Sequence, residues 1–139
     1  MNNNREWIPG LSVGGISFGL NETDLVEKLG FKLVALAPEG DPEGWTVYGK
    51  GDNFNVCCEE GKVVCITCYD HLIIKGKDII GRSLPEIAKF LNYQNFVEGE
   101  PMELHPGIEI PVEFEGLGLQ LWVDEQGIAK NASLDDASL

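Results

Sequence analysis

NETDLVEKLGF, residues 21–31, and SLPEIAKFLNY, residues 83–93, match one another in kind when they are aligned at an offset of 62 residues. Each stretch begins with a residue that commonly caps a helix, Asn21 or Ser83, and has an acid three positions later, which is the pattern of a capping box. Apolar residues then recur at helical spacing, and Gly30 and Asn92 both tolerate the left-handed conformation that ends a helix. The pattern predicts two equivalent helices, near residues 22–29 and 84–91.

Segments with strand character follow each predicted helix and are separated by short turns. After the first helix these segments are residues 31–37, 45–49, 54–59 and 62–69; after the second they are residues 108–115, 117–123 and 128–133. Residues 71–75 form a further short strand or a bridge between the halves. Strands joined by such short turns must be antiparallel.

We therefore expect an α+β fold, in which two helix-plus-antiparallel-hairpin repeats form one curved, mostly antiparallel sheet with the helices on one face. The chain is short enough for one domain, residues 1–139, with half-repeats at approximately 11–75 and 76–139.

The net charge is −13, from 23 acidic and 10 basic residues, and this argues against nucleic acid or an anionic membrane surface as the partner. The longest aliphatic run, residues 33–37, is far shorter than the roughly 20 residues of a membrane-spanning helix. The polar start of the sequence has no apolar signal core, so we expect a cytoplasmic protein.

The second hairpin has a clear period of two, because apolar residues alternate with Glu109, Pro111, Glu113 and Glu115. With Glu115-Gly116 as the turn, the predicted apolar pairs are Phe114–Leu117, Val112–Leu119, Ile110–Leu121 and Ile108–Val123. The opposite face then places Glu109 beside Trp122, Pro111 beside Gln120, and Glu113 beside Gly118. One face of the hairpin is predicted to be core, and the other is acidic and carries a tryptophan.

Acidic residues are concentrated around this hairpin, since residues 90–129 contain eight acids and no Lys or Arg. An acidic surface often serves only solubility, but a field of one sign around an aromatic side chain is typical of a binding face for a basic protein. The other interpretation, that a helix covers the face with Trp122, stays open. The candidate partner-binding residues are Glu98, Glu100, Glu103, Glu109, Glu113, Glu115, Gln120 and Trp122.

The four cysteines and one histidine offer a metal site as an alternative, since Cys65, Cys68 and His71 form a C-x2-C-x2-H pattern. A strand over residues 63–69, however, would point Cys65 and Cys68 to opposite faces. With a turn at Glu60-Gly61, Cys58 faces Val63 and Val56 faces Cys65, while Cys57 joins Cys68 on the reverse face. We interpret all four cysteines as reduced, buried thiols.

No catalytic motif surrounds His71 or His105, so the sequence predicts no catalytic residue, no metal and no cofactor.

The repeated pattern, in which Gly19 or Gly81 precedes the cap, the acid, the apolar stripe and the hairpin, resembles the tandem helix-plus-sheet repeats of β-lactamase-inhibitor-protein-like proteins. Separately, a small, acidic, single-domain cytosolic chain without catalytic residues is similar to bacterial immunity proteins of the contact-dependent growth inhibition type. Proteins of that class neutralise a cognate toxin, often a basic nuclease. Both resemblances imply a protein-binding inhibitor, and no functional residue is carried over from either.

The leading hypothesis is a non-enzymatic binding protein that neutralises a basic protein partner, such as a toxin nuclease encoded nearby. One alternative is an enzyme or metal protein that uses the residues Cys57, Cys58, Cys65, Cys68 and His71. Another is a domain whose curved sheet holds a small apolar ligand.

Overall fold

The computed structural model describes residues 6–35, 46–49, 54–93, 95–104 and 107–136. Strands account for 52% of the described residues and helices for only 12%. The expected α+β fold with two helix-plus-hairpin repeats is therefore wrong. Both helices are short, and most of the described residues belong to one large antiparallel sheet and two small sheets, so the molecule is mostly β and not a balanced pair of helix-plus-hairpin repeats.

Within the described residues, the elements fall into one large sheet, two small sheets and two helices. The helices are α1 (Glu22–Glu27) and α2 (Leu84–Leu91). The strands of the large sheet are β4 (Lys32–Ala35), β5 (Thr46–Gly49), β6 (Phe54–Glu59), β7 (Lys62–Cys68), β10 (Val97–Glu98), β11 (Met102–Leu104), β12 (Gly107–Phe114), β13 (Leu119–Val123) and β14 (Ala129–Asp135). The small sheets consist of β1 (Trp7–Ile8), β2 (Ser12–Val13) and β3 (Ile16–Ser17), and of β8 (Ile73–Ile74) and β9 (Lys77–Asp78).

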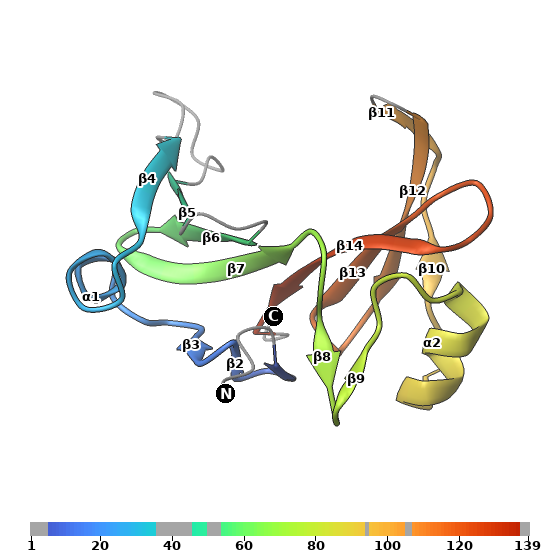
Figure 1. Ribbon diagram of the computed structural model, residues 1–139, viewed down its shortest axis with the longest axis horizontal. Helices are drawn as coiled ribbons and strands as arrows, with labels where there is room; N and C mark the ends of the chain where they lie inside the picture. The colour runs from blue at the N-terminus through green and yellow to red at the C-terminus, as the bar shows by residue number, and fades with distance from the viewer. Residues whose placement is uncertain (1–5, 36–45, 50–53, 94, 105–106, 137–139) are drawn as a thin grey trace.

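Two meanders make up the large sheet, whose order is β10-β12-β13-β14-β7-β6-β5-β4, with β11 also paired to β12. The first meander, β4 to β7, meets the second where β7 pairs with β14. Figure 1 shows that the sheet is strongly curved, with β4 and β12 rising at its two ends. The helices and the two small sheets lie below it in that view. Among the predicted strand residues, 36, 37 and 45 lie outside the described part of the chain.

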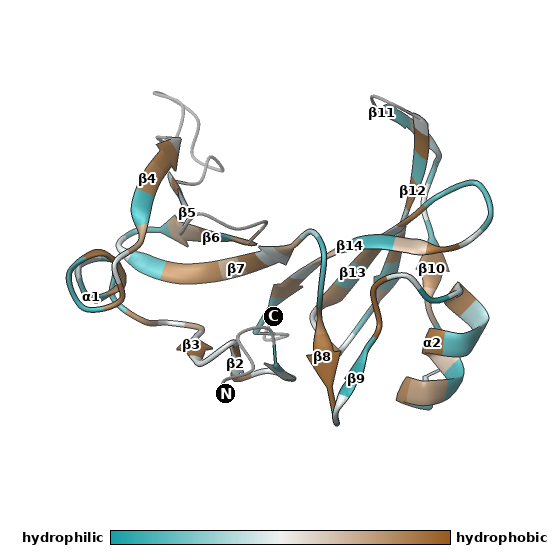
Figure 2. Cartoon of the chain, in the orientation of Figure 1, coloured by the Kyte–Doolittle hydropathy of each residue, from teal (hydrophilic) through white to brown (hydrophobic). Residues whose placement is uncertain are grey.

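The hydrophobic core lies between the sheet and the layer of helices and small sheets. One face of the sheet supplies fully buried residues such as Val56, Ile66, Phe114 and Leu121. The layer below supplies the others, which include Trp7, Val13, Leu25, Leu72, Ile79 and Ile87. In Figure 2, β7 and β8 consist mostly of hydrophobic residues, whereas hydrophobic and hydrophilic residues alternate along α2. The alternation in α2 is expected for a helix that buries one face.

The two halves share a backbone hydrogen-bond pattern around the start of each helix. In the first half the N–H of Gly19 donates to the carbonyl of Val63, whose own N–H donates to the carbonyl of Leu20. In the second half Gly81 and Ala129 make the same pair of bonds, with Arg82 in the place of Leu20. The start of each helix is thus tied to the strand that lies at the centre of the sheet.

A pseudo-two-fold axis passes between those central strands, β7 and β14. Thr67 pairs with Ser133, flanked by the pairs Cys68–Ala132 and Ile66–Leu134. Residues of β7 correspond to residues of β14 at an offset of 66, so a two-fold rotation about the Thr67–Ser133 pair exchanges the two flanking pairs. The hydroxyl oxygens of Thr67 and Ser133 lie 3.2 Å apart, within hydrogen-bond distance.

The helix ends match the prediction better in the second half than in the first. The Ser83 hydroxyl accepts a hydrogen bond from the backbone N–H of Glu86, and Asn92 ends α2 in the left-handed conformation. The predicted cap of α1 is wrong in part, because the Asn21 side chain makes no capping hydrogen bond. Gly30 does take a positive φ of 78° just after α1.

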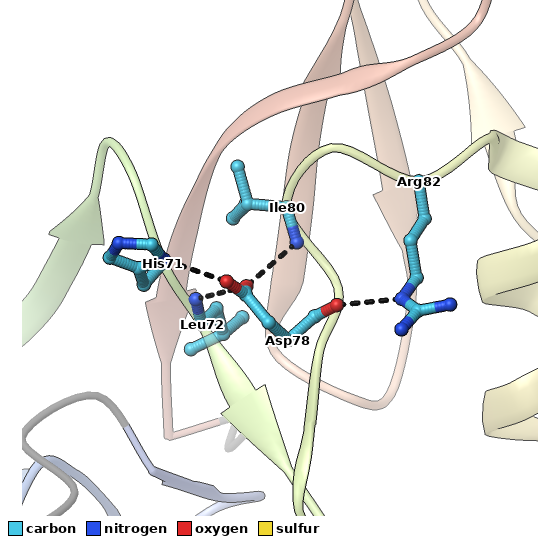
Figure 3. A network of polar contacts seen from close by, with 5 residues as sticks. All are labelled: His71, Leu72, Asp78, Ile80 and Arg82. Carbon is cyan, nitrogen blue, oxygen red and sulfur yellow. Dashed lines mark hydrogen bonds and ion pairs between the residues drawn. The ribbon is translucent and has the colours of Figure 1, made fainter.

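Asp78 anchors the β8–β9 hairpin to the segment that leads into α2 (Figure 3). One carboxylate oxygen accepts hydrogen bonds from the backbone N–H groups of Leu72 and Ile80, and the other lies 2.7 Å from Nδ1 of His71. Arg82 donates to the backbone carbonyl of Asp78 and pairs with Glu86 on α2. In this network the His71 side chain pairs with Asp78 of the hairpin, and not with the cysteines of the predicted C-x2-C-x2-H pattern.

None of the helices in the described ranges is long and apolar enough to cross a membrane.

Candidate partner-binding face

The face of the large sheet that points away from the helices carries polar side chains, and we call it the open face. It is formed by the residues of β6, β7 and β12 to β14 whose neighbours in each strand point into the core: Asn55, Cys57, Cys65, Thr67, Pro111, Glu113, Gln120, Trp122, Asn131, Ser133 and Asp135. Neither helix and neither small sheet lies over this face in Figure 1. Trp122, Gln120, Thr67 and Ser133 are half-buried, although no described element covers them.

The predicted register of the β12–β13 hairpin is wrong by two residues. Phe114 pairs with Leu119 instead of Leu117, and Ile110 pairs with Val123. The reason is a longer turn, in which Gly116 and Gly118 both take a positive φ and the N–H of Leu117 donates to the carbonyl of Phe114. Because the error is an even number of residues, every side chain remains on its predicted face.

The corrected register changes the neighbours of the candidate residues. Glu113 lies beside Gln120 and Pro111 beside Trp122, so the predicted neighbours Glu109 and Trp122 are not a cross-strand pair. Glu109 instead pairs with Met102 of β11. Glu109, Glu113 and Glu115 are separated by even numbers of residues, and the two that belong to β12, Glu109 and Glu113, lie on the same side of that strand.

Three carboxylates come close together at one end of the open face. The pKa of Glu113 is raised above its usual value by burial and then by the negative charges of Asp135 and Glu115. Asp135 reaches this position because β14 pairs Asp135 with Cys65 and Ser133 with Gln120. Sequence reasoning did not place Asp135 in the site, since its neighbours depend on the pairing of strands from different halves.

A cavity of about 170 Å³ lies beside these carboxylates. It is lined by Cys65, Thr67, Glu113, Gln120, Ser133, Leu134 and Asp135. The cavity is therefore lined by two carboxylates, an amide and the two hydroxyls at the pseudo-two-fold axis, a set of groups that is able to accept hydrogen bonds from a cationic side chain.

The remaining candidate acids lie away from this cluster. Glu98 pairs with Val112 and Glu103 pairs with Ile108, so both project to the side of β12 opposite Glu113. Glu100 is exposed in the connection between β10 and β11. The structure thus brings Glu113, Glu115 and Gln120 to one end of the open face with Asp135, and it does not bring Glu98, Glu100 or Glu103 there.

A β-bulge changes the predicted facing of the cysteines. Cys58 pairs with Val63 as predicted, but the register then shifts, so that Cys57 pairs with Cys65 and Val56 with Ile66. Val64 is the extra residue. Cys58 and Cys68 therefore lie in the core, whereas Cys57 and Cys65 lie side by side on the open face.

The alternative hypothesis of a Cys/His metal site is not supported by the arrangement of the described side chains. Within the described residues, no three His, Cys, Asp or Glu side chains are grouped closely enough to hold a metal ion. His71 pairs with Asp78, and His105 lies outside the described residues.

The chain matches no known family model, no curated protein and no solved structure at a significant level.

Proposed function

We propose that this chain is a non-enzymatic binding protein that holds a basic segment of another protein on its open face. In this proposal it acts in the cytoplasm as an immunity protein that blocks a cognate nuclease toxin. The observation that carries the proposal is the presence of a half-buried tryptophan and a cluster of three carboxylates on the same sheet face, which no described element covers.

The carboxylate cluster supports a cationic partner. Burial and like charge raise the pKa of Glu113, so its ionised form is disfavoured in the isolated protein. A Lys or Arg side chain placed among Glu113, Glu115 and Asp135 would remove that repulsion and gain charge-assisted hydrogen bonds. A nuclease uses the same Lys and Arg side chains to hold phosphates, so carboxylates at this position would compete with its substrate.

Trp122 supports a protein partner over a small ion. It lies two strand positions from Gln120 on β13, beside Pro111, and exposes part of an aromatic surface one row of the sheet away from Glu113. Aromatic side chains of this kind often dominate protein interfaces, and truncation of such a residue costs about 2 kcal/mol or more.

The test uses the product of the gene next to this one, with binding kinetics recorded at low and high salt. Glu113→Gln combined with Glu115→Gln should slow association, and the parent rate should fall as salt is added. Trp122→Ala should mainly speed dissociation and weaken binding roughly 30-fold, which corresponds to about 2 kcal/mol.

A matched control separates the open face from general charge. Glu98→Gln combined with Glu103→Gln removes the same charge from the other side of β12, and it should change association much less. Equal slowing by both double variants would place the binding site elsewhere. Absence of binding by a basic nuclease encoded nearby would contradict the immunity role.

A further inference from the structure

Two cysteines on the open face lie directly opposite each other on adjacent strands. Cys57 of β6 and Cys65 of β7 are Cα partners in the antiparallel ladder. Partners in such a ladder have Cα atoms about 4.5–5.5 Å apart, which falls inside the range of about 4.4–6.8 Å that a disulfide spans. The β-bulge next to Cys57 creates this pairing, because a regular hairpin would place Cys65 opposite Val56.

The two thiols also contact each other. The Cys65 thiol donates a hydrogen bond to the sulfur of Cys57, which lowers the pKa of Cys57 although burial opposes that change. The same hydrogen bond, followed by burial, raises the pKa of Cys65, which therefore keeps its proton. Ionisation of the pair is therefore favoured at Cys57 over Cys65.

The other two cysteines provide an internal comparison. Cys58 and Cys68 are 2% and 0% exposed and belong to the core, and their ladder partners are Val63 and Phe54, with Thr46 and Ala132 on the outer sides. Cys57 and Cys65 are 7% and 8% exposed, and Cys65 lines the open-face cavity of about 170 Å³. A small oxidant in this cavity therefore reaches Cys65, whose strand partner is Cys57.

We propose that Cys57 and Cys65 form a redox modification site, which a peroxide closes to a cross-strand disulfide within one molecule. The Cys57 thiolate attacks one oxygen of hydrogen peroxide, the O–O bond breaks, and the hydroxide released takes up a proton to become water. The sulfur of Cys65 then attacks the Cys57 sulfenic acid, the S–O bond breaks, and the leaving hydroxide departs as water with the Cys65 proton. The two thiols lose two electrons and the peroxide gains them. The site does not depend on the proposed partner.

The test treats the folded, reduced protein with hydrogen peroxide and measures its intact mass and its thiols in denaturant. The protein should lose the mass of two hydrogen atoms, remain monomeric on a non-reducing gel, and keep two of its four thiols. Dithiothreitol should restore all four. Four remaining thiols, or covalent dimers as the main product, would overturn the proposal.

Two variants assign the bond to specific sulfurs. Cys57→Ser combined with Cys65→Ser should abolish the intramolecular disulfide, whereas Cys58→Ala combined with Cys68→Ala should retain it. An unchanged rate in the first variant would show that other sulfurs react.

Because Cys58 and Cys68 are core residues, replacing them can disturb the fold. The protein without substitutions therefore provides a second assignment of the disulfide. Trypsin separates residues 51–62 from residues 63–75, and fragmentation of the linked peptides distinguishes Cys57 from Cys58 and Cys65 from Cys68. A link through Cys58 or Cys68 would overturn the proposal.

Discussion

The N-terminal and C-terminal halves of this molecule share a backbone pattern but differ in the side chains that complete it. Both halves tie the start of a helix to a central strand through the same backbone hydrogen bonds. The helix of the first half has six residues and no side-chain cap, whereas the helix of the second half has eight residues and is capped by Ser83. The comparison teaches that the backbone contacts are sufficient to position either helix.

The open face differs between the halves in a way that concerns function. In the first half it carries Cys57 and Asn55, and in the second half it carries Glu113, Gln120 and Trp122. Residues 76–139 contain twelve acids and four bases, compared with ten acids and five bases in residues 11–75. The shared scaffold therefore presents a partner-binding surface mainly through the second half.

The largest expected effect tests whether both helices belong to one core. Leu25 on α1 and Ile87 on α2 occupy equivalent, fully buried positions. Replacing either with Ala should lower the free energy of unfolding by about 2–5 kcal/mol, measured by urea denaturation. Val26→Ala on the exposed side of α1 is the control and should change stability little. A loss below about 1 kcal/mol at Leu25 would show that α1 contributes little to the common core.

The helix caps provide a smaller and more specific comparison. Ser83→Ala should cost about 1 kcal/mol, because it removes the hydrogen bond to the Glu86 N–H. Asn21→Ala should cost less, because the Asn21 side chain makes no such bond. Thermal and urea denaturation of the two variants give the difference directly, and equal losses would mean that Asn21 caps α1 in solution.

The two small hairpins differ at one turn residue, and the difference predicts changes of opposite sign. The β2–β3 turn uses Gly14 and Gly15 at positive φ, whereas the β8–β9 turn has Lys75 at φ 52° before Gly76. Lys75→Gly should stabilise the protein by about 1 kcal/mol, because glycine adopts this conformation without steric cost. Gly14→Ala should destabilise it by a similar amount. Denaturation curves check both signs, and destabilisation by Lys75→Gly would contradict the turn assignment.

The smallest effect concerns the pH dependence of stability at Glu113. Its pKa is raised in the folded protein, so its ionisation disfavours folding: the cost is absent below the usual pKa of glutamate, grows as the pH rises towards the raised pKa, and is fully present above it. Glu113→Gln should therefore stabilise the protein at neutral pH by only about 0.5 kcal/mol, since solvent screens this exposed carboxylate. The gain should vanish in acid.

Glu98→Gln, on the other side of the sheet, is the control for this comparison. A gain at Glu113 that persists below the usual pKa of glutamate would contradict the electrostatic explanation.

Local patterns in the sequence predicted much of the secondary structure. Capping residues and apolar spacing located both helices, and alternation assigned Val112, Phe114 and Leu121 to the core correctly. The fold class was wrong because the described chain is mostly strand, and part of that strand content lies in short elements such as β10 and β11, which have two and three residues. Segments of that length carry almost no periodic signal.

The errors at the candidate site come from non-local geometry. The bulge inserts Val64 between the partners of Cys58 and Cys57, and no residue of the hairpin marks this position in the sequence. The longer turn after Phe114 had a readable signal, since Gly116 and Gly118 flank Leu117. Asp135 joins Glu113 only through the pairing of β14 with both β13 and β7, which links distant parts of the chain.

The β7–β14 pairing also has a consequence for how the chain folds. Thr67 and Ser133 are 66 positions apart, so closing this pair costs more chain entropy than forming the hairpin of β6 and β7. We expect each meander to form first and the two to join late. At high protein concentration during refolding, the unpaired edge of β7 can pair with β14 of a second molecule through the same contacts that it makes with β14 of its own chain. Exchange of halves between molecules is then the expected assembly error, and refolding by rapid dilution favours the monomer.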